Sequence, residues 1–152
     1  SSAELLKVRT VEERLRRTFL FSDAVTNTTL FSLAKNCTIT RLHAGRHFIG
    51  DPHQLHLIGK GRLAKGNDEK APVLGKGEFW GADSLFAAVS KGAGEPAVAA
   101  APEPSLVALD SCEVYSVPLK LVSRIPVVRW KLFEAFRNAH PYAAPRYRGT
   151  AR

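Results

Sequence analysis

The sequence predicts a mainly β protein: an antiparallel β-sandwich or jelly roll with N-terminal helices and two C-terminal helices. Helical periodicity of apolar residues occurs towards the two ends of the chain, whereas between them apolar residues recur every second position. Glycine turns separate these short alternating segments. Short strands at such spacing are typical of a sandwich or jelly roll. The length of 152 residues suits one domain.

The N-terminal segment is expected to be helical over residues 3–18. Charged residues separate apolar positions at three-to-four spacing, namely Leu5, Val8, Val11 and Leu15. Thr10 followed by Glu13 fits a capping box, which predicts that a second helix starts at Thr10. An aromatic anchor at residues 19–21 and a short helix over residues 29–35 follow.

After Asn36 the period of the apolar residues changes to two, which indicates strands. The expected strands cover residues 37–42, 47–49, 55–58, 62–64, 73–74, 78–80, 106–109 and 113–117. Gly59 and Gly61 are expected to end the third of these strands. Residues 87–104 are low in complexity and are expected to form a long mobile loop.

Two helices are expected after the last strand, over residues 119–125 and 126–140. Pro126 suits a first helical position, and Pro141 ends the pattern. We therefore divide the chain into an N-terminal helix at residues 1–18, a sandwich domain at 19–140 and a basic, disordered tail at 141–152. The polar start and the loose end suggest a piece of a larger protein.

The charge balance favours acidic partners. The formal net charge is +8 and the isoelectric point is about 9.9, which suits nucleic acid, an anionic membrane or an acidic protein surface, although a solvated face explains it as well. Cys37 and Cys112 form no CxxC pattern and are expected to be buried, reduced thiols on strands. No signal peptide or membrane-length apolar run is present. A cytoplasmic, intracellular protein is therefore expected.

Metal and catalytic sites find little support. His43, His47, His53 and His56 lie within fourteen residues, which invites a cupin-type metal site. His53 and His56 are three apart, however, so on one strand they face opposite sides. We expect surface or half-buried imidazoles, no metal and no cofactor. Nucleophile and phosphate-loop motifs are absent, so the chain is not expected to be an enzyme. The two tryptophans are interpreted as core aromatics.

Four segments carry a resemblance to a known family: residues 43–49 (HAGRHFI), 55–63, 77–85 (GEFWGADSL) and 105–118. Their order and spacing resemble those of cyclic-nucleotide-binding domains, found in the catabolite activator, protein kinase A regulatory subunits and gated channels. The resemblance covers about residues 19–137, so the sandwich domain is interpreted as cyclic-nucleotide-binding-like. The DNA-reading helices that follow this domain in bacterial regulators are not expected, because the sequence ends soon after His140.

Residues 77–86 look like the entrance of the family's phosphate-binding cassette. The resemblance implies a Glu that accepts a hydrogen bond from the ribose 2′-hydroxyl, but that position is Ala82. It also implies an Arg that pairs with the cyclic phosphate. No Arg lies between Arg62 and Arg124, and the expected position falls near Pro102 or Glu103.

The same resemblance makes the Ser84 backbone amide compatible with a phosphate. Losing one partner of a buried, charged hydrogen bond costs roughly 2–5 kcal/mol. Cyclic AMP and cyclic GMP are therefore not expected to bind usefully. Two compensations remain open, namely Asp83 in place of the Glu by a one-residue shift and Lys91 in place of the Arg. A pocket for a ligand would be lined by Phe79, Gly81, Ala82, Asp83, Ser84, Leu85, Ser105 and Val107.

The first hypothesis is a regulatory or protein-interaction module of a larger protein, with a protein partner bound through the terminal helices. The second is a sensor for a cyclic nucleotide or a different small ligand in the remodelled pocket. A cupin-like enzyme comes third, and nucleic acid is the weaker candidate partner. An open, apolar pocket would favour the sensor. A pocket filled by Trp80 or by residues 87–104 would favour the module.

Overall fold

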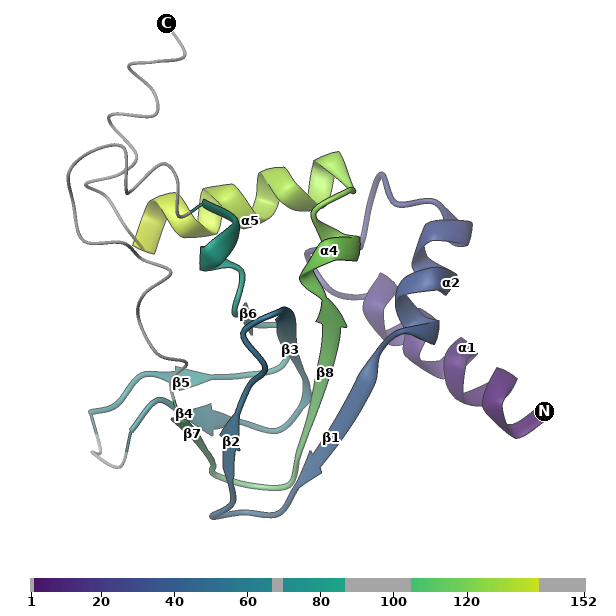
Figure 1. Cartoon of the computed structure of the whole chain (residues 1–152). Coiled ribbons are helices and arrows are strands. Elements are labelled where there is room, and N and C mark those ends of the chain that lie inside the picture. The colour runs from purple at the N-terminus through teal and green to yellow at the C-terminus, as the bar shows by residue number, and fades with distance from the viewer. Residues whose placement is uncertain (1, 67–69, 87–104, 140–152) are drawn as a thin grey trace, which may run out of the picture.

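The strands form two four-stranded antiparallel sheets in a computed structural model that describes residues 2–66, 70–86 and 105–139 (Figure 1). One sheet has the order β1-β8-β3-β6 and the other the order β2-β7-β4-β5. The strands are β1 (Thr38–Leu42), β2 (His47–Ile49), β3 (Gln54–Lys60), β4 (Leu63–Ala64), β5 (Val73–Leu74), β6 (Phe79–Trp80), β7 (Ser105–Ala108) and β8 (Cys112–Pro118). The predicted fold class, an antiparallel sandwich with flanking helices, is confirmed.

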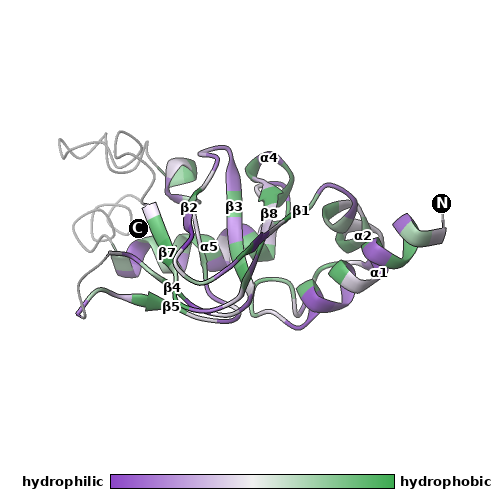
Figure 2. Cartoon of the chain, turned by 90° about the horizontal axis from the view of Figure 1, so that it is seen from below, coloured by the Kyte–Doolittle hydropathy of each residue, from purple (hydrophilic) through white to green (hydrophobic). Residues whose placement is uncertain are grey.

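Each expected strand is present, and no bound is shifted by more than two residues. The clearest difference concerns β3, which continues through Gly59 to Lys60 instead of ending before the glycine. Its register against β8 shifts between Ile58 and Lys60. Such an irregularity bends a strand without ending its pairing. Figure 2 shows that hydrophobic and hydrophilic residues both occur along α1, α2 and β3.

The helices lie at two ends of the sandwich (Figure 1). α1 (Ser2–Arg16) and α2 (Asn27–Lys35) lie together beside β1, and α4 (Leu119–Val122), α5 (Pro126–Ala139) and the 3₁₀ helix η1 (Asp83–Phe86) lie beyond the end of β8. Thr26 caps α2, because its hydroxyl oxygen accepts a hydrogen bond from the Thr29 amide at 3.2 Å. In the part of the chain that the structure describes, no helix is long and apolar enough to cross a bilayer.

The N-terminal helix differs from the expectation in two ways. The predicted second helix start at Thr10 is wrong, because α1 is continuous and the Thr10 hydroxyl donates to the Leu6 carbonyl oxygen at 3.0 Å. That bond occupies the hydroxyl inside the helix, so it caps nothing. The apolar stripe is also shorter than predicted, because Leu5 is 50% exposed whereas Val11 and Leu15 are buried.

Buried apolar side chains form two clusters on opposite faces of the β1-β8-β3-β6 sheet. The helix-side cluster joins that sheet to the helices and includes Val11, Leu15, Leu20, Phe21, Leu30, Leu33, Leu55, Leu57, Ala82, Phe86, Tyr115, Val117, Val128, Leu132, Phe133 and Phe136. The inter-sheet cluster consists of Phe48, Ile58, Leu63, Leu106, Ala108, Cys112 and Val114, with Leu42, Leu74 and Trp80 packed against it. Because its members come from both sheets, the inter-sheet cluster is the interior of the sandwich.

The aromatic residues expected in the core or as an anchor differ in their burial. Trp80 is half-buried beside the inter-sheet cluster, whereas Trp130 on α5 is 60% exposed, so its interpretation as a core aromatic was wrong. Phe21 of the aromatic anchor is fully buried, but Phe19 is 63% exposed. Its ring instead lies under the ammonium group of Lys131, 4.5 Å from the ring centroid.

The two cysteines are free thiols. Cys112 is buried on β8, as predicted, whereas Cys37 is only half-buried and lies just before β1. Burial nevertheless raises the pKa of the Cys37 thiol to about 11. The thiol is therefore protonated at neutral pH and is a poor nucleophile.

Candidate functional site

The cassette-like segment includes β6, the edge strand of the β1-β8-β3-β6 sheet, and continues into η1. β6 pairs with β3, with Trp80 opposite His56 and Phe79 opposite Leu57. Gly81 follows with a φ of +100°, which glycine adopts without strain. A Cβ at this position would also lie 2.8 Å from the Gln54 carbonyl oxygen. Both the dihedral angle and the close approach therefore require glycine where the chain turns from the sheet towards η1.

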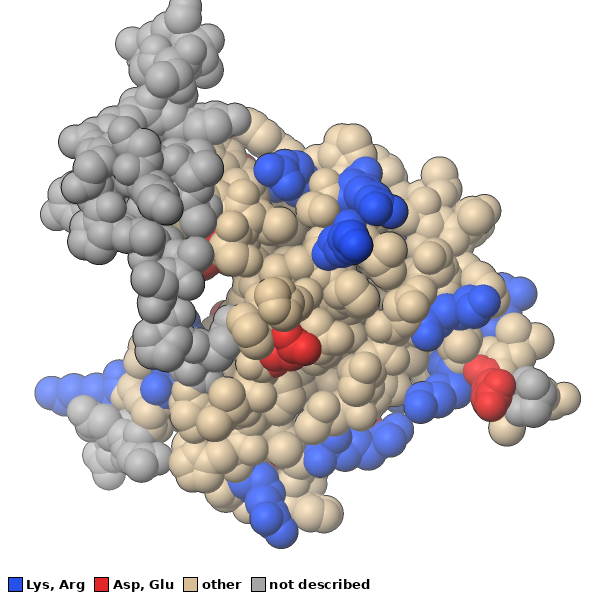
Figure 3. Space-filling model, in the orientation of Figure 1, with Lys and Arg blue, Asp and Glu red and all other residues tan. Residues whose placement is uncertain are grey.

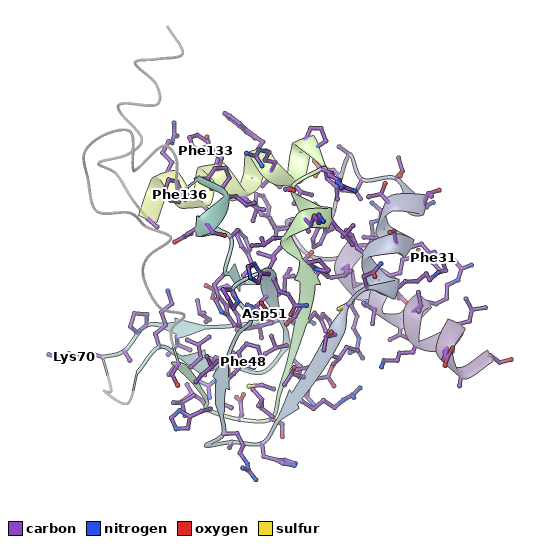
Figure 4. The ribbon with its side chains drawn as sticks, viewed as in Figure 1. Phe31, Phe48, Asp51, Lys70, Phe133 and Phe136 are labelled. Carbon is purple, nitrogen blue, oxygen red and sulfur yellow. The ribbon has the colours of Figure 1, made fainter. Side chains whose placement is uncertain are left out.

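The single turn of η1 is held against α5 by an aromatic cluster. The buried ring of Phe86 lies with its centroid 5.3 Å from that of Phe133 and 5.3 Å from that of Phe136. The guanidinium of Arg129 lies 5.5 Å from the Phe86 ring centroid. Figure 4 shows Phe133 and Phe136 on α5 beside this turn. Apolar packing on α5 therefore fixes the position of the cassette-like segment.

Ala82 stands at the position that the family resemblance assigns to the ribose-binding Glu. Its side chain is buried in the helix-side cluster, and the half-buried Phe79 and Leu85 pack against the same cluster. The side chains of Asp83 and Ser84 are exposed. Three of the predicted ligand-binding residues therefore contribute to the core under the helices.

The two predicted ligand-binding residues on β7 lie elsewhere. Ser105 and Val107 alternate with Leu106 and Ala108, which belong to the inter-sheet cluster, so they occupy the other face of β7. The Ser105 hydroxyl lies 3.2 Å from Nδ1 of the exposed His47. Lys91, Pro102 and Glu103, considered above as possible phosphate contacts, lie outside the described residues.

A buried histidine lies directly behind the cassette-like segment. His56 is 1% exposed, and its ring centroid lies 5.3 Å from that of Phe48 and 5.3 Å from that of Trp80. Phe48 and Trp80 meet edge to face at 5.9 Å. The three rings come from β2, β3 and β6, and Figure 4 labels Phe48 among the side chains between the sheets. Aromatic rings therefore fill the end of the sandwich interior next to Gly81.

Hydrogen bonds fix the tautomer of the neutral form of this histidine. Nε2 lies 3.1 Å from the Asp51 carbonyl oxygen and must donate a proton to it. Nδ1, 2.7 Å from the Ser116 hydroxyl oxygen, then accepts the hydroxyl proton. Burial lowers the pKa of His56 below its ordinary value, and the opposing effect of Asp51 is smaller. His56 is therefore neutral at physiological pH.

The close packing around the imidazole also determines which residue can precede Asp51. A Cβ at Gly50 would overlap the His56 ring, so the backbone before Asp51 can lie this close to the ring only because residue 50 is glycine. The prediction of surface or half-buried imidazoles was therefore wrong for His56 and correct for the exposed His43, His47 and His53. Within the described ranges no three potential ligands gather into a metal site.

The indole nitrogen of Trp80 is a second unusual polar atom in this region. Nε1 is buried and has no hydrogen-bond partner among the described residues. A buried donor without a partner destabilises the fold by about 1–3 kcal/mol. No sequence pattern signalled this donor or the buried histidine, because a single polar residue in an apolar strand can face either side.

No protein-family model matches the sequence, and no curated protein matches it either. Solved structures do match. The second CBD of PKAR, bound to Sp-2Cl-cAMPS, superimposes with a TM-score of 0.65 at 16% identity, over 93% of this chain and 92% of that one. The chain has the fold of a cyclic-nucleotide-binding domain. This fold has the element order that the sequence predicted.

Two further structures with this fold come from trypanosomes. The regulatory subunit of a cAMP-independent protein kinase A from Trypanosoma brucei gives a TM-score of 0.67 at 18% identity, over 94% of this chain. The corresponding Trypanosoma cruzi subunit, bound to guanosine, gives 0.60 at 11% identity, over 91% of this chain. The chain spans about half the length of these two subunits, 51% and 49%. Identities this low show the fold alone.

Proposed function

We propose that this domain uses the cyclic-nucleotide-binding fold as a regulatory or protein-interaction module of a larger intracellular protein, without binding cyclic AMP or cyclic GMP usefully. The observation that carries the proposal is the burial of Ala82 among core side chains. A methyl group cannot accept the ribose hydrogen bond. The sequence also contains no Arg between Arg62 and Arg124 to pair with a cyclic phosphate.

The interior of the sandwich supports the same proposal. The rings of Phe48, His56 and Trp80 are in mutual contact next to the cassette-like segment. A ligand entering between the sheets here would have to displace rings that pack against Ile58 and Leu106 in the inter-sheet cluster. This filled interior is the arrangement expected of an interaction module rather than of a nucleotide sensor.

The energetic cost of the two missing contacts is large compared with typical ligand affinities. Each desolvated, charged hydrogen bond that loses a partner weakens binding by roughly 2–5 kcal/mol, and about 1.4 kcal/mol corresponds to a tenfold change. Micromolar affinity would therefore fall to millimolar or weaker. One structure with this fold is the regulatory subunit of a cAMP-independent protein kinase A from Trypanosoma brucei, so the fold is compatible with such a role.

Isothermal titration calorimetry with cyclic AMP and cyclic GMP, up to millimolar concentration at physiological salt, tests the proposal. We expect no saturable heat for either nucleotide, and a cyclic-nucleotide-binding domain of a protein kinase A regulatory subunit serves as the positive control. A dissociation constant below about 10 μM would overturn the proposal. Asp83→Ala and Lys91→Ala would then identify the side chain that replaces the missing contacts.

A nucleoside sensor is the second candidate. A nucleoside has no phosphate, so the missing Arg does not weaken its binding, and one neighbouring structure holds guanosine. The buried Trp80 Nε1–H would gain a partner if a ligand acceptor reached it. Titration with guanosine and adenosine distinguishes the two functions. Saturable binding that Trp80→Phe weakens supports the sensor, and silence supports the module.

A further inference from the structure

The exposed face of the N-terminal helix pair combines apolar and basic side chains. Leu5 and Leu6 are 50% and 69% exposed on α1. They share the solvent side of the helix with Arg9, opposite the buried Val11 and Leu15. Phe31 and Lys35 of the neighbouring α2 complete a surface that we call the α1–α2 patch: Leu5, Leu6, Arg9, Phe31 and Lys35.

Two cations of the α1–α2 patch are held close to one aromatic ring. The guanidinium carbon of Arg9 and the ammonium nitrogen of Lys35 each lie 5.8 Å from the Phe31 ring centroid. Figure 4 labels Phe31 on α2, and Figure 3 shows Lys and Arg side chains over this end of the molecule. Two like charges beside one ring repel each other, so an anion placed between them would be stabilised by both.

Little negative charge offsets these cations within the patch. Arg9 has an ion pair with Glu12 at 3.5 Å, but its side chain remains 64% exposed. Among the described residues, no carboxylate lies within ion-pair distance of Lys35. Both cations therefore remain accessible to an acidic group from another molecule.

The helix pair is fixed to the sandwich, so the α1–α2 patch is preformed. Arg14 of α1 donates to Glu113 on β8 at 2.8 Å and to the Tyr115 hydroxyl. Arg16 donates to the Val25 carbonyl oxygen at 2.8 Å and to the Asn27 side chain at 2.8 Å. A preformed surface loses little conformational entropy when it binds.

We propose that the α1–α2 patch binds an acidic amphipathic segment of a partner protein. Aliphatic side chains of the segment cover Leu5 and Leu6, and its carboxylates lie beside Arg9 and Lys35. An amphipathic helix on an apolar surface flanked by complementary charge is a common recognition mode. This inference rests on the proposed role as an interaction module and specifies the kind of partner.

Other occupants fit the surface less well. In a symmetric dimer through this face, Arg9 and Lys35 of one copy would lie against Arg9 and Lys35 of the other. These like charges would repel each other, and so would the net charge of +8 on each copy. A nucleic acid would leave the two exposed leucines uncovered, since phosphates recruit cations and hydrogen-bond donors.

Three matched synthetic peptides provide the probe. The first peptide is an 18-residue helix former with leucines on one face and glutamates flanking them. In the second peptide the glutamates are replaced by lysines, and in the third the leucines are replaced by serines. Titration of each peptide into the isotope-labelled protein, followed by NMR, locates and quantifies binding. We expect the glutamate–leucine peptide to bind about tenfold or more tightly than either other peptide, with shifts on α1 and α2 and weaker binding at high salt.

Surface variants assign the interaction to the patch. Arg9→Glu/Lys35→Glu and Leu6→Ser should each weaken the first peptide by about tenfold or more, and exposed positions leave the fold intact. Arg46→Glu/Lys76→Glu carries the same charge change at exposed positions elsewhere and should leave the affinity unchanged. Equal binding of all three peptides, or equal effects of both double variants, would overturn the proposal.

Two further probes separate the inference from its alternatives. The protein could bind phosphatidylserine vesicles or poly(U) RNA more tightly than the first peptide and lose this binding in Arg9→Glu/Lys35→Glu. That result would overturn the proposal in favour of a membrane or nucleic-acid site. The nucleotide titration reports on the cassette-like segment and not on α1–α2. If both the nucleotides and the first peptide bind, only the proposed function is overturned. If neither the nucleotides nor the peptide bind, only this inference is overturned.

Discussion

The two faces of β3 place neighbouring residues in very different surroundings. Leu55 and Leu57 point into the helix-side cluster, where burial is complete and contacts are apolar. His56, between them, points into the sandwich interior and is held by two hydrogen bonds and two aromatic rings. Apolar burial is non-directional, whereas the histidine needs particular partners at particular distances. Both faces bury apolar side chains, since Ile58 of β3 belongs to the inter-sheet cluster, but only the interior face also carries a hydrogen-bonded histidine that fixes the shape of the site.

The largest expected effect is on the apolar face. Leu57→Ala removes a fully buried side chain from the helix-side cluster and should lower the free energy of unfolding by about 2–5 kcal/mol. Urea denaturation followed by circular dichroism measures the change. Leu6→Ala, at a 69% exposed position, is the control and should change the free energy by less than about 0.5 kcal/mol. Similar values for both variants would contradict the expected contribution of Leu57 burial to stability.

A smaller effect on stability is expected at Gly50, where the backbone packs against the His56 ring. Gly50→Ala places a methyl group against the His56 ring and should lower the free energy of unfolding by about 1–3 kcal/mol. Gly75→Ala is the matched control, because its Cβ would lie 3.8 Å from the nearest atom, Glu78 Oε1, and fits. In the double variant Gly50→Ala/His56→Ala the methyl group has room. A double-mutant cycle should therefore show coupling, and strictly additive effects would refute the contact.

Sequence patterns predicted the architecture well because strand and turn signals are local. The alternation of apolar residues located the strands along the chain, and Gly61, expected to end a strand, has a positive φ of +83°. The replacement of the ribose-binding Glu by Ala82 was also visible without a structure. The faces of the predicted ligand-binding residues Ser105 and Val107 on β7 were harder to predict, because the pairing of β7 with β2 decides which face each side chain occupies.

Tertiary contacts decided what the patterns could not predict. Leu5 fits the apolar stripe of α1 but is exposed near the start of that helix. Trp130 is exposed on α5 although Val128 and Leu132, which flank it in the sequence, are buried. His56 looks like one of four clustered histidines in the sequence, and only the pairing of β3 with β8 and β6 places Ser116 and Trp80 beside it. A periodic pattern identifies the face of an element but not how far its neighbour extends.

The smallest and most specific effect concerns the pH dependence of stability. Because burial lowers the pKa of His56 in the folded protein below the ordinary value of 6.5, the unfolded chain takes up a proton at this residue first as pH falls. The stability that neutral His56 contributes is therefore complete above pH 6.5 and declines below it, towards the lower pKa of the folded state.

Denaturation curves at closely spaced pH values from 7.5 to about 5, above the range in which most carboxylates titrate, measure this decline. His56→Gln should be less steeply destabilised by acid over this window than the unmodified protein, whatever its absolute stability. His53→Gln, at an exposed position, should retain the original slope. Two polar groups lie next to His56: the Ser116 hydroxyl, which carries no charge, and Asp51, which favours the protonated ring. Neither group can therefore lower the pKa of His56, and the burial of the ring must do so. If His56→Gln has the same dependence of stability on pH as the unmodified protein, the aromatic surroundings do not exclude the charged ring.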